Sequence, residues 1–213
     1  AGDGESALYV SDLENAELTY EKKHELNIGA AFGFFDNRIN IEADWYKRNN
    51  YDLIGPVTTQ GIGGQVTKLG NVASMQSSGV ELTLSTVNIN KKNFKWTTDF
   101  IYSHAENRVT SLENQQRVID LVAGTGFALE GYPVRSVFSI PFRGLNEQGV
   151  PTFLDQNGNV TTTGIYFQER DKIDFLEYSG TADPTDFGSF GNTFQYKGLK
   201  LNVFFTYSFG NVV

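Results

Sequence analysis

The chain has 213 residues and a formal net charge of −8 at neutral pH, with an isoelectric point near 4.8. This acidic balance argues against a nucleic-acid partner, because binding to phosphates needs a basic surface. Cysteine is absent from the sequence, which excludes a disulfide framework, a thiolate nucleophile and a cysteine-based zinc site. Aromatic residues make up 14% of the chain and glycine occurs 22 times, a composition that favours a folded, strand-rich protein.

The sequence has no run of about 18 apolar residues, so we expect no transmembrane helix. It starts at Ala1, has Met75 as its only methionine, and does not open on a charged segment followed by an apolar one. We therefore expect neither an initiator methionine nor a signal peptide. A transmembrane strand needs only about ten residues of alternating character, so insertion through strands remains open.

Alternation of apolar and polar residues with a period of two marks strands with two different faces. It predicts six strands, at about 20–33, 38–48, 78–88, 94–106, 187–197 and 199–209. The last strand has the cleanest pattern, with Phe204 as the exception on its polar face.

The connections between these strands alternate strictly between short and long. Short turns are expected at Phe34–Asn37, Ile89–Asn93 and Lys197-Gly198, and long loops at about 49–77 and 107–186. An up-and-down transmembrane β-barrel has this arrangement, with short turns on the periplasmic side and long loops outside. The second loop is too long to lack structure in a functional protein, and its residues 118–123 suit one or two helical turns.

Under the barrel interpretation, each strand turns its apolar residues to lipid and its polar residues to the lumen. The predicted lipid-facing residues are Leu26, Ile28, Ile39, Ile41, Val80, Leu82, Leu84, Phe100, Leu201, Val203 and Phe205. The predicted lumen-facing residues are Asn27, Asn40, Glu42, Asp44, Glu81, Thr83, Asp99 and Asn202. Aromatic residues near both strand ends agree with the interfacial belts of such barrels; they are Phe34, Phe35, Phe94, Trp96, Trp45, Tyr46 and Tyr102.

Six strands cannot close a transmembrane barrel, because such barrels start at about eight strands. The barrel interpretation therefore makes the chain a segment of a larger wall. The alternative is a soluble or surface β-sandwich with a glycan-binding or adhesive role, in which the alternate residues form a core.

One weak candidate for a metal site is the run Asp155, Asn157 and Asn159, which has oxygen ligands at alternate positions like the start of a calcium loop. It contains a single carboxylate, and no Glu follows at the twelfth position. The dipeptide Asn157-Gly158 between two apolar pairs instead predicts a hairpin with a type I′ turn. We expect no resident cofactor and leave calcium as the alternative.

No pattern supports catalysis, and we expect no catalytic residue. Glu42 and Asp44 share one strand face, but carboxylates in a wet lumen need no catalytic role. His24 and His104 share no ligand spacing. The segments 61–64 and 124–126 are incomplete glycine fingerprints outside any strand–helix unit, and they are expected to be loops.

An ordered set of motifs resembles the barrel of SusC/RagA-type TonB-dependent transporters. The match includes Gly33-Phe34-Phe35-Asp36-Asn37-Arg38, Gly79-Val80-Glu81-Leu82, Glu130-Gly131-Tyr132-Pro133 and the late hairpin Phe187–Phe209 with Tyr196-Lys197-Gly198. Ser77 stands where the family usually has Asn. The resemblance covers nearly the whole chain, 1–213, as one partial barrel domain.

This resemblance implies a bacterial outer-membrane barrel of about 22 strands with an N-terminal plug, of which this sequence matches a late portion. It implies active import of oligosaccharides or peptides, a SusD-like surface lipoprotein as lid, and energy from the TonB complex. The plug and the TonB-contacting motif are not found in this sequence. A passive porin is the third interpretation.

Overall fold

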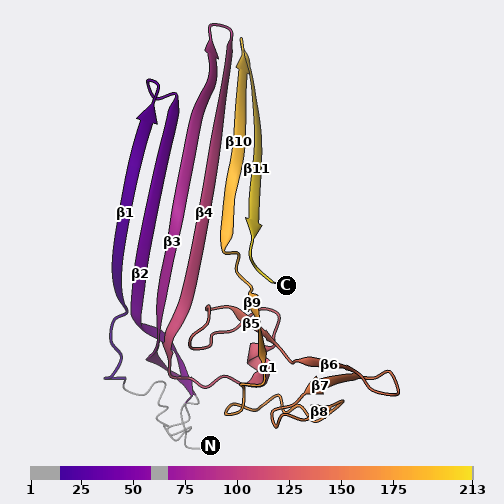
Figure 1. Cartoon of the computed structure of the whole chain (residues 1–213). Helices are drawn as coiled ribbons and strands as arrows, with labels where there is room; N and C mark the ends of the chain where they lie inside the picture. The colour runs from indigo at the N-terminus through magenta and orange to yellow at the C-terminus, as the bar shows by residue number, and fades with distance from the viewer. Residues whose placement is uncertain (1–14, 59–66, 213) are drawn as a thin grey trace, which may run out of the picture.

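The computed structural model describes residues 15–58 and 67–212, and a six-stranded antiparallel sheet dominates it (Figure 1). Neighbouring strands in this sheet follow the order β1-β2-β3-β4-β10-β11. Their bounds are β1 (Lys22–Phe34), β2 (Ile39–Thr58), β3 (Thr67–Lys91), β4 (Phe94–Leu112), β10 (Asp186–Tyr196) and β11 (Leu199–Phe209). All six predicted strands are present, and each pairs with its neighbour in the chain order that an up-and-down wall requires.

Three short turns join the strands at one end of the sheet (top of Figure 1). The turn after β1 holds Phe35, Asp36 and Asn37 in the left-handed region, with φ of 54°, 54° and 60°. The turn between β10 and β11 is Lys197-Gly198, as predicted. The turn between β3 and β4 is tighter than the predicted Ile89–Asn93, because β3 continues through a bulge between Val87 and Ile89 as far as Lys91.

Strands β2, β3 and β4 are much longer than the alternation predicted. Within 49–77, expected to be a loop, the described residues belong largely to β2 and β3, and β4 also runs past residue 106. The prediction was wrong here because both faces turn polar beyond the apolar stretch, as at Ser77 and Ser78, so the period-2 signal ends while the backbone ladder continues. A bulge between Asn50 and Ile54 lies in this extension.

The second long connection, 107–186, contains a small folded body at the opposite end from the short turns (Figure 1). It comprises the one-turn helix α1 (Val118–Leu121), as expected for 118–123, and two small antiparallel sheets. One sheet pairs β5 (Ser136–Ser139) with β9 (Glu177–Thr181), and the other joins β6 (Phe142–Leu145), β7 (Pro151–Leu154) and β8 (Val160–Thr161).

The few buried apolar side chains lie away from the middle of the large sheet, at this loop end. Val118 and Leu121 are fully buried, and Phe138 packs edge-on against Tyr132 at 5.0 Å between ring centroids. Backbone bonds from Val118 and Ile119 tie α1 to the segment at Phe167–Glu169. The loop body therefore has its own small core.

Within the described residues, no second sheet covers either face of the six-stranded sheet, and the two small sheets lie at one end of it (Figure 1). Large apolar side chains on it, such as Ile28, Leu201 and Phe205, remain more than half exposed. A β-sandwich would bury one of these faces. None of the helices among the described residues is long and apolar enough to cross a membrane.

Candidate functional site: a two-faced wall and its loop end

The pairing register places the apolar residues of all six strands on one face, which we call the apolar face. Antiparallel partners point to the same side of a sheet, and the rows connect across it. One such row is Phe32, Ile41, Leu84, Phe100, Phe190 and Phe205. Every residue predicted to face lipid lies on this face. Its orientation toward lipid stays a prediction.

The opposite, polar face holds every residue predicted to face the lumen. Asp44 lies directly opposite Glu81, and Glu42 is two residues further along the same strand. Asp99 accepts a hydrogen bond from Ser85 Oγ at 2.8 Å. No ion pair involves these four acids within the part of the chain that the structure describes, so the middle of this face is acidic.

The three short turns do not end on one row of the sheet. Phe34 at the end of β1 shares a row with Thr98 of β4, four residues from the end of that strand at Phe94. The other two hairpins end level with each other, because Tyr196 at the end of β10 pairs with Phe94.

The apolar face ends along a sharp polar boundary. On five neighbouring strands, the first polar residue beyond the apolar run is His24, Lys47, Ser78, His104 or Asp186. Each of them lies eight to thirteen residues from the short-turn end of its strand. These lengths are close to the nine to eleven residues that a transmembrane strand needs.

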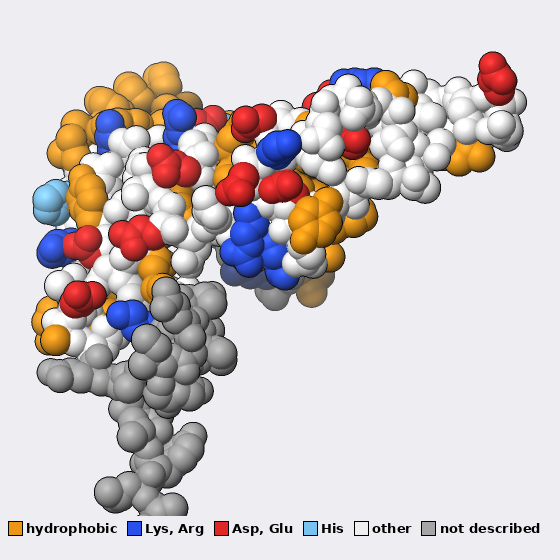
Figure 2. Space-filling view, turned by 90° about the horizontal axis from the view of Figure 1, so that it is seen from below, with side chains coloured by type: hydrophobic (Ala, Val, Ile, Leu, Met, Phe, Trp, Pro, Cys, Tyr) orange, Lys and Arg blue, Asp and Glu red, His pale blue; other side chains and the backbone are white. Residues whose placement is uncertain are grey.

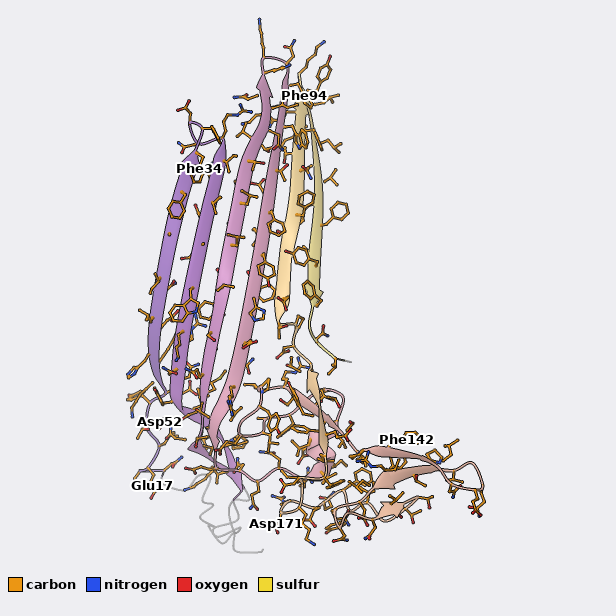
Figure 3. The ribbon with its side chains drawn as sticks, in the orientation of Figure 1. Glu17, Phe34, Asp52, Phe94, Phe142 and Asp171 are labelled. Carbon is orange, nitrogen blue, oxygen red and sulfur yellow. The ribbon has the colours of Figure 1, made fainter. Side chains whose placement is uncertain are left out.

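Side chains near the two ends of the sheet can be followed in Figure 3. Phe34 and Phe94 lie beside the short turns, and Glu17, Asp52, Phe142 and Asp171 lie at the loop end. Hydrophobic side chains gather along one side of the molecule when it is seen from below (Figure 2).

Asn192 is a polar residue within the apolar band, and the period-2 pattern did not predict its place there. Asn192 Oδ1 accepts hydrogen bonds from Trp96 Nε1 at 2.9 Å and from Thr98 Oγ1 at 2.7 Å. Asn88 Nδ2 donates to Thr98 Oγ1 at 2.6 Å. These polar groups therefore have hydrogen-bond partners across β3, β4 and β10 although they lie on the apolar face.

The run Asp155, Asn157 and Asn159 forms a closed turn. Phe153 pairs with Thr161, which confirms the predicted hairpin. The type I′ turn was wrong, because Asn157 does not have a positive φ and the connection has five residues. Asp155 Oδ1 accepts the backbone N–H groups of Asn157 and Asn159 at 2.9 and 2.8 Å. These bonds hold the pKa of Asp155 below its usual range.

The hydrogen bonds of this turn also involve the residues of the predicted calcium site, Asp155, Asn157 and Asn159. Asn157 Oδ1 accepts a hydrogen bond from Lys172 Nζ at 3.1 Å, which brings a positive charge next to this turn. No group of three or more His, Cys, Asp or Glu side chains suited to a metal ion occurs among the described residues. Of the two glycine segments, 61–64 lies outside the described residues, and 124–126 lies in a turn where Gly126 has a φ of 74°.

Ion pairs order the loop body. Arg117 caps α1 and forms a two-pronged pair with Asp120, at 2.7 and 2.8 Å from Nη2 and Nε. This pair lowers the pKa of Asp120 and raises that of Arg117. Arg135 Nη1 binds Asp183 at 2.6 Å. No local pattern predicts the pair of Arg135 with Asp183, because these residues are 48 positions apart, whereas Arg117 and Asp120 stand three residues apart at α1.

An up-and-down strand order, an exposed apolar band and short turns at one end define the class: the sheet is a segment of an antiparallel, up-and-down transmembrane β-barrel wall. The sheet and its loop body also match a solved transporter, described as the RagAB peptide transporter, with a TM-score of 0.74 at 26% identity. The match covers 94% of this chain and 22% of that one. The RagAB peptide importer in its 'closed-closed' state gives a TM-score of 0.75, also at 26% identity, over 95% of this chain and 22% of that one.

Sequence relatives agree with the structural match. The chain is 25% identical to TonB-dependent receptor P3 of Formosa agariphila, over 98% of this chain and 22% of that protein. It is 28% identical to TonB-dependent receptor SusC of Bacteroides thetaiotaomicron, over 69% of this chain and 16% of that protein. No family profile matches the chain. The predicted resemblance to SusC/RagA-type TonB-dependent transporters is confirmed, and the chain spans about a fifth of the length of these relatives.

Proposed function

We propose that this chain forms part of the barrel wall of an outer-membrane, TonB-dependent importer of oligosaccharides or peptides. The observation that carries the proposal is the exposed apolar band, which crosses all six strands and ends on five of them at a polar boundary. Relatives named as TonB-dependent receptors and a peptide transporter support the transport role. No bond chemistry is part of this function.

The proposed mechanism is ligand-gated import through the lumen that the polar face lines. Substrate binds on the outer side beneath a SusD-like lipoprotein, a plug changes state, and the TonB complex supplies energy through parts of the protein beyond this chain. The loop body of 113–185 lies at the end of the wall opposite the short turns, so we assign it to the outer side and to contact with the lid.

The proposal is tested by uptake in cells that produce the complete transporter together with its lipoprotein partner. Fluorescent peptides and oligosaccharides are supplied with and without a functional TonB complex. We expect at least one class to accumulate only when TonB is present. Uptake that is independent of TonB would indicate a passive porin and contradict the proposal.

The β-sandwich alternative has little support, because it needs a second sheet over an apolar face that stays exposed in the described part of the chain. A sandwich protein would remain in solution without detergent. We expect the complete protein to be recovered in the membrane fraction and to need detergent for extraction.

A further inference from the structure

The short-turn end of the wall is basic, although the chain as a whole is acidic. The three turns and the residues beside them, 34–40, 88–96 and 194–201, contain six cations and a single acid, Asp36. These cations, which we call the basic end, are Arg38, Lys91, Lys92, Lys95, Lys197 and Lys200. No ion pair involves any of the six within the part of the chain that the structure describes. The short-turn end therefore has the opposite sign to the chain, whose net charge is −8.

A groove of about 340 Å³ lies at this end, where the shorter β1–β2 hairpin stops beside the longer β3–β4 hairpin. Its lining residues are Phe35, Arg38, Ile39, Thr86, Val87 and Asn88. Ile39 pairs with Thr86 on the apolar face, and Thr86 Oγ1 donates to Asn88 Oδ1 at 3.0 Å, so the groove borders that face. Ligand pockets begin at about 300 Å³, so the groove has room for a small headgroup.

Arg38 is the cation of this groove, and the backbone of β3 holds its guanidinium group. Nε and Nη2 donate to the carbonyl oxygen of Val87 at 3.3 and 3.1 Å, and Nη2 also donates to that of Asn88 at 3.0 Å. These acceptors are neutral, so they leave the positive charge of Arg38 uncompensated. Nη1 has no hydrogen-bond partner among the described residues. A guanidinium fixed in this way keeps donors for an anion and loses little freedom when it binds one.

Exposed aromatic rings lead from the groove into the apolar band. Phe35, in the groove lining, is 75% exposed. Phe34 pairs with Ile39, and the ring of Phe32 stacks on that of Phe34 at 6.5 Å between centroids. Phe32 and Phe34 are also exposed, and Phe34 can be followed in Figure 3. A basic group beside exposed apolar rings fits a molecule that has an anionic head and a hydrocarbon tail.

We propose that this groove binds the phosphate of an anionic phospholipid in the periplasmic leaflet, with one acyl chain against Phe32 and Phe34. The phosphate gains charge-assisted hydrogen bonds from Arg38, and the other cations of the basic end attract it. A soluble phosphate would gain nothing from the exposed rings, which favours a lipid as its source. This inference rests on the proposed function, which puts the short turns on the periplasmic side, and goes beyond it.

The test is native mass spectrometry of the complete transporter, purified with its lipoprotein in detergent. Phosphatidylglycerol, phosphatidylcholine with the same acyl chains, or soluble glycerol phosphate is added, and the bound copies per complex are counted. We expect phosphatidylglycerol to be retained in preference to phosphatidylcholine, and glycerol phosphate not to displace it. The preference should weaken as the concentration of ammonium acetate rises.

Matched variants assign this retention to the groove. Arg38→Gln is expected to lower the affinity for phosphatidylglycerol about fivefold, the factor for one cation beside an anionic lipid surface. Arg143→Gln removes a cation from β6, at the opposite end of the molecule, and is expected to leave the affinity unchanged. The double variant Lys92→Gln, Lys197→Gln changes only exposed turns and is expected to lower the affinity as well, so it decides the question if Arg38→Gln fails to fold.

Equal retention of phosphatidylglycerol and phosphatidylcholine would overturn the lipid inference. So would equal effects of Arg38→Gln and Arg143→Gln. Displacement of the lipid by glycerol phosphate would indicate a site for free phosphate and also contradict it. Each of these results leaves TonB-dependent uptake intact, whereas absence of TonB-dependent uptake contradicts the proposed function itself.

Discussion

Arginine placed at Leu82 tests the orientation of the apolar face. Leu82 lies four residues, about 13 Å of strand, from Ser78 at the polar boundary, which is near the middle of an apolar band about 25 Å tall. Arginine on the lipid side at the midplane costs about 2–4 kcal/mol. That cost lowers the folded-to-unfolded ratio by about 30- to 900-fold.

Thr83 is the matched control, because it is the next residue on β3 and lies at nearly the same height on the polar face. Arginine at Thr83 faces water and acidic neighbours such as Glu42, its partner across β2, so we expect a cost well below that at Leu82. The assay is urea unfolding of the complete protein folded into lipid bilayers, followed by the gel shift between folded and boiled barrels. Equal losses for Leu82→Arg and Thr83→Arg would refute the two-faced assignment.

Two further predictions concern glycine packing and loop protonation. A Cβ on Gly79 would lie 2.5 Å from the carbonyl oxygen of His104 and 2.7 Å from Tyr46 Oη. Gly79→Ala is therefore expected to destabilise the barrel by about 1–3 kcal/mol in the same urea assay. Gly198 has open space around it, so Gly198→Ala is the control and is expected to leave stability nearly unchanged. The pKa of Asp155 is lowered by backbone N–H donors, so its ionised form stabilises the turn at neutral pH and this contribution is lost as the pH falls below about 4. Amide hydrogen exchange at 155–159, corrected for intrinsic rates, should be faster at pH 3 than at pH 7. The variant Asp155→Asn should show this fast exchange already at pH 7. Unchanged exchange rates would contradict the role of the carboxylate.

The two faces of the wall were predictable because consecutive residues of a strand point to opposite sides of the sheet, and here one side is apolar and the other polar. Leu82 and Thr83 show this alternation over a single step. The tight turn at Lys197-Gly198 was also predictable, because a turn of this kind depends on the backbone preference of the residues within it.

The strand ends were not predictable in the same way. Beyond the polar boundary, Ser77 and Ser78 both face water, so no pattern distinguishes strand from loop, and the ladder from β2 to β4 extends the sheet. The predicted type I′ turn does not form, because Asp155 Oδ1 accepts the backbone N–H groups of Asn157 and Asn159.

A cavity of about 280 Å³ at the loop end of β4 depends on contacts that are distant in sequence. Glu106, Tyr178 and Asp183 belong to segments about 70 residues apart and meet only after the loop body folds. Single residues of common types carry no motif, so local pattern could not identify them as a set.

The most direct test of the central claim is a spin-label scan along β3 in bilayers, at Val80, Glu81, Leu82, Thr83 and Leu84. The chain contains no cysteine, so each introduced cysteine labels this segment at one site. The account predicts that Val80, Leu82 and Leu84 are accessible to lipid-soluble oxygen, and that Glu81 and Thr83 are shielded from it. Uniform accessibility along these five positions would contradict a wall with one face in lipid.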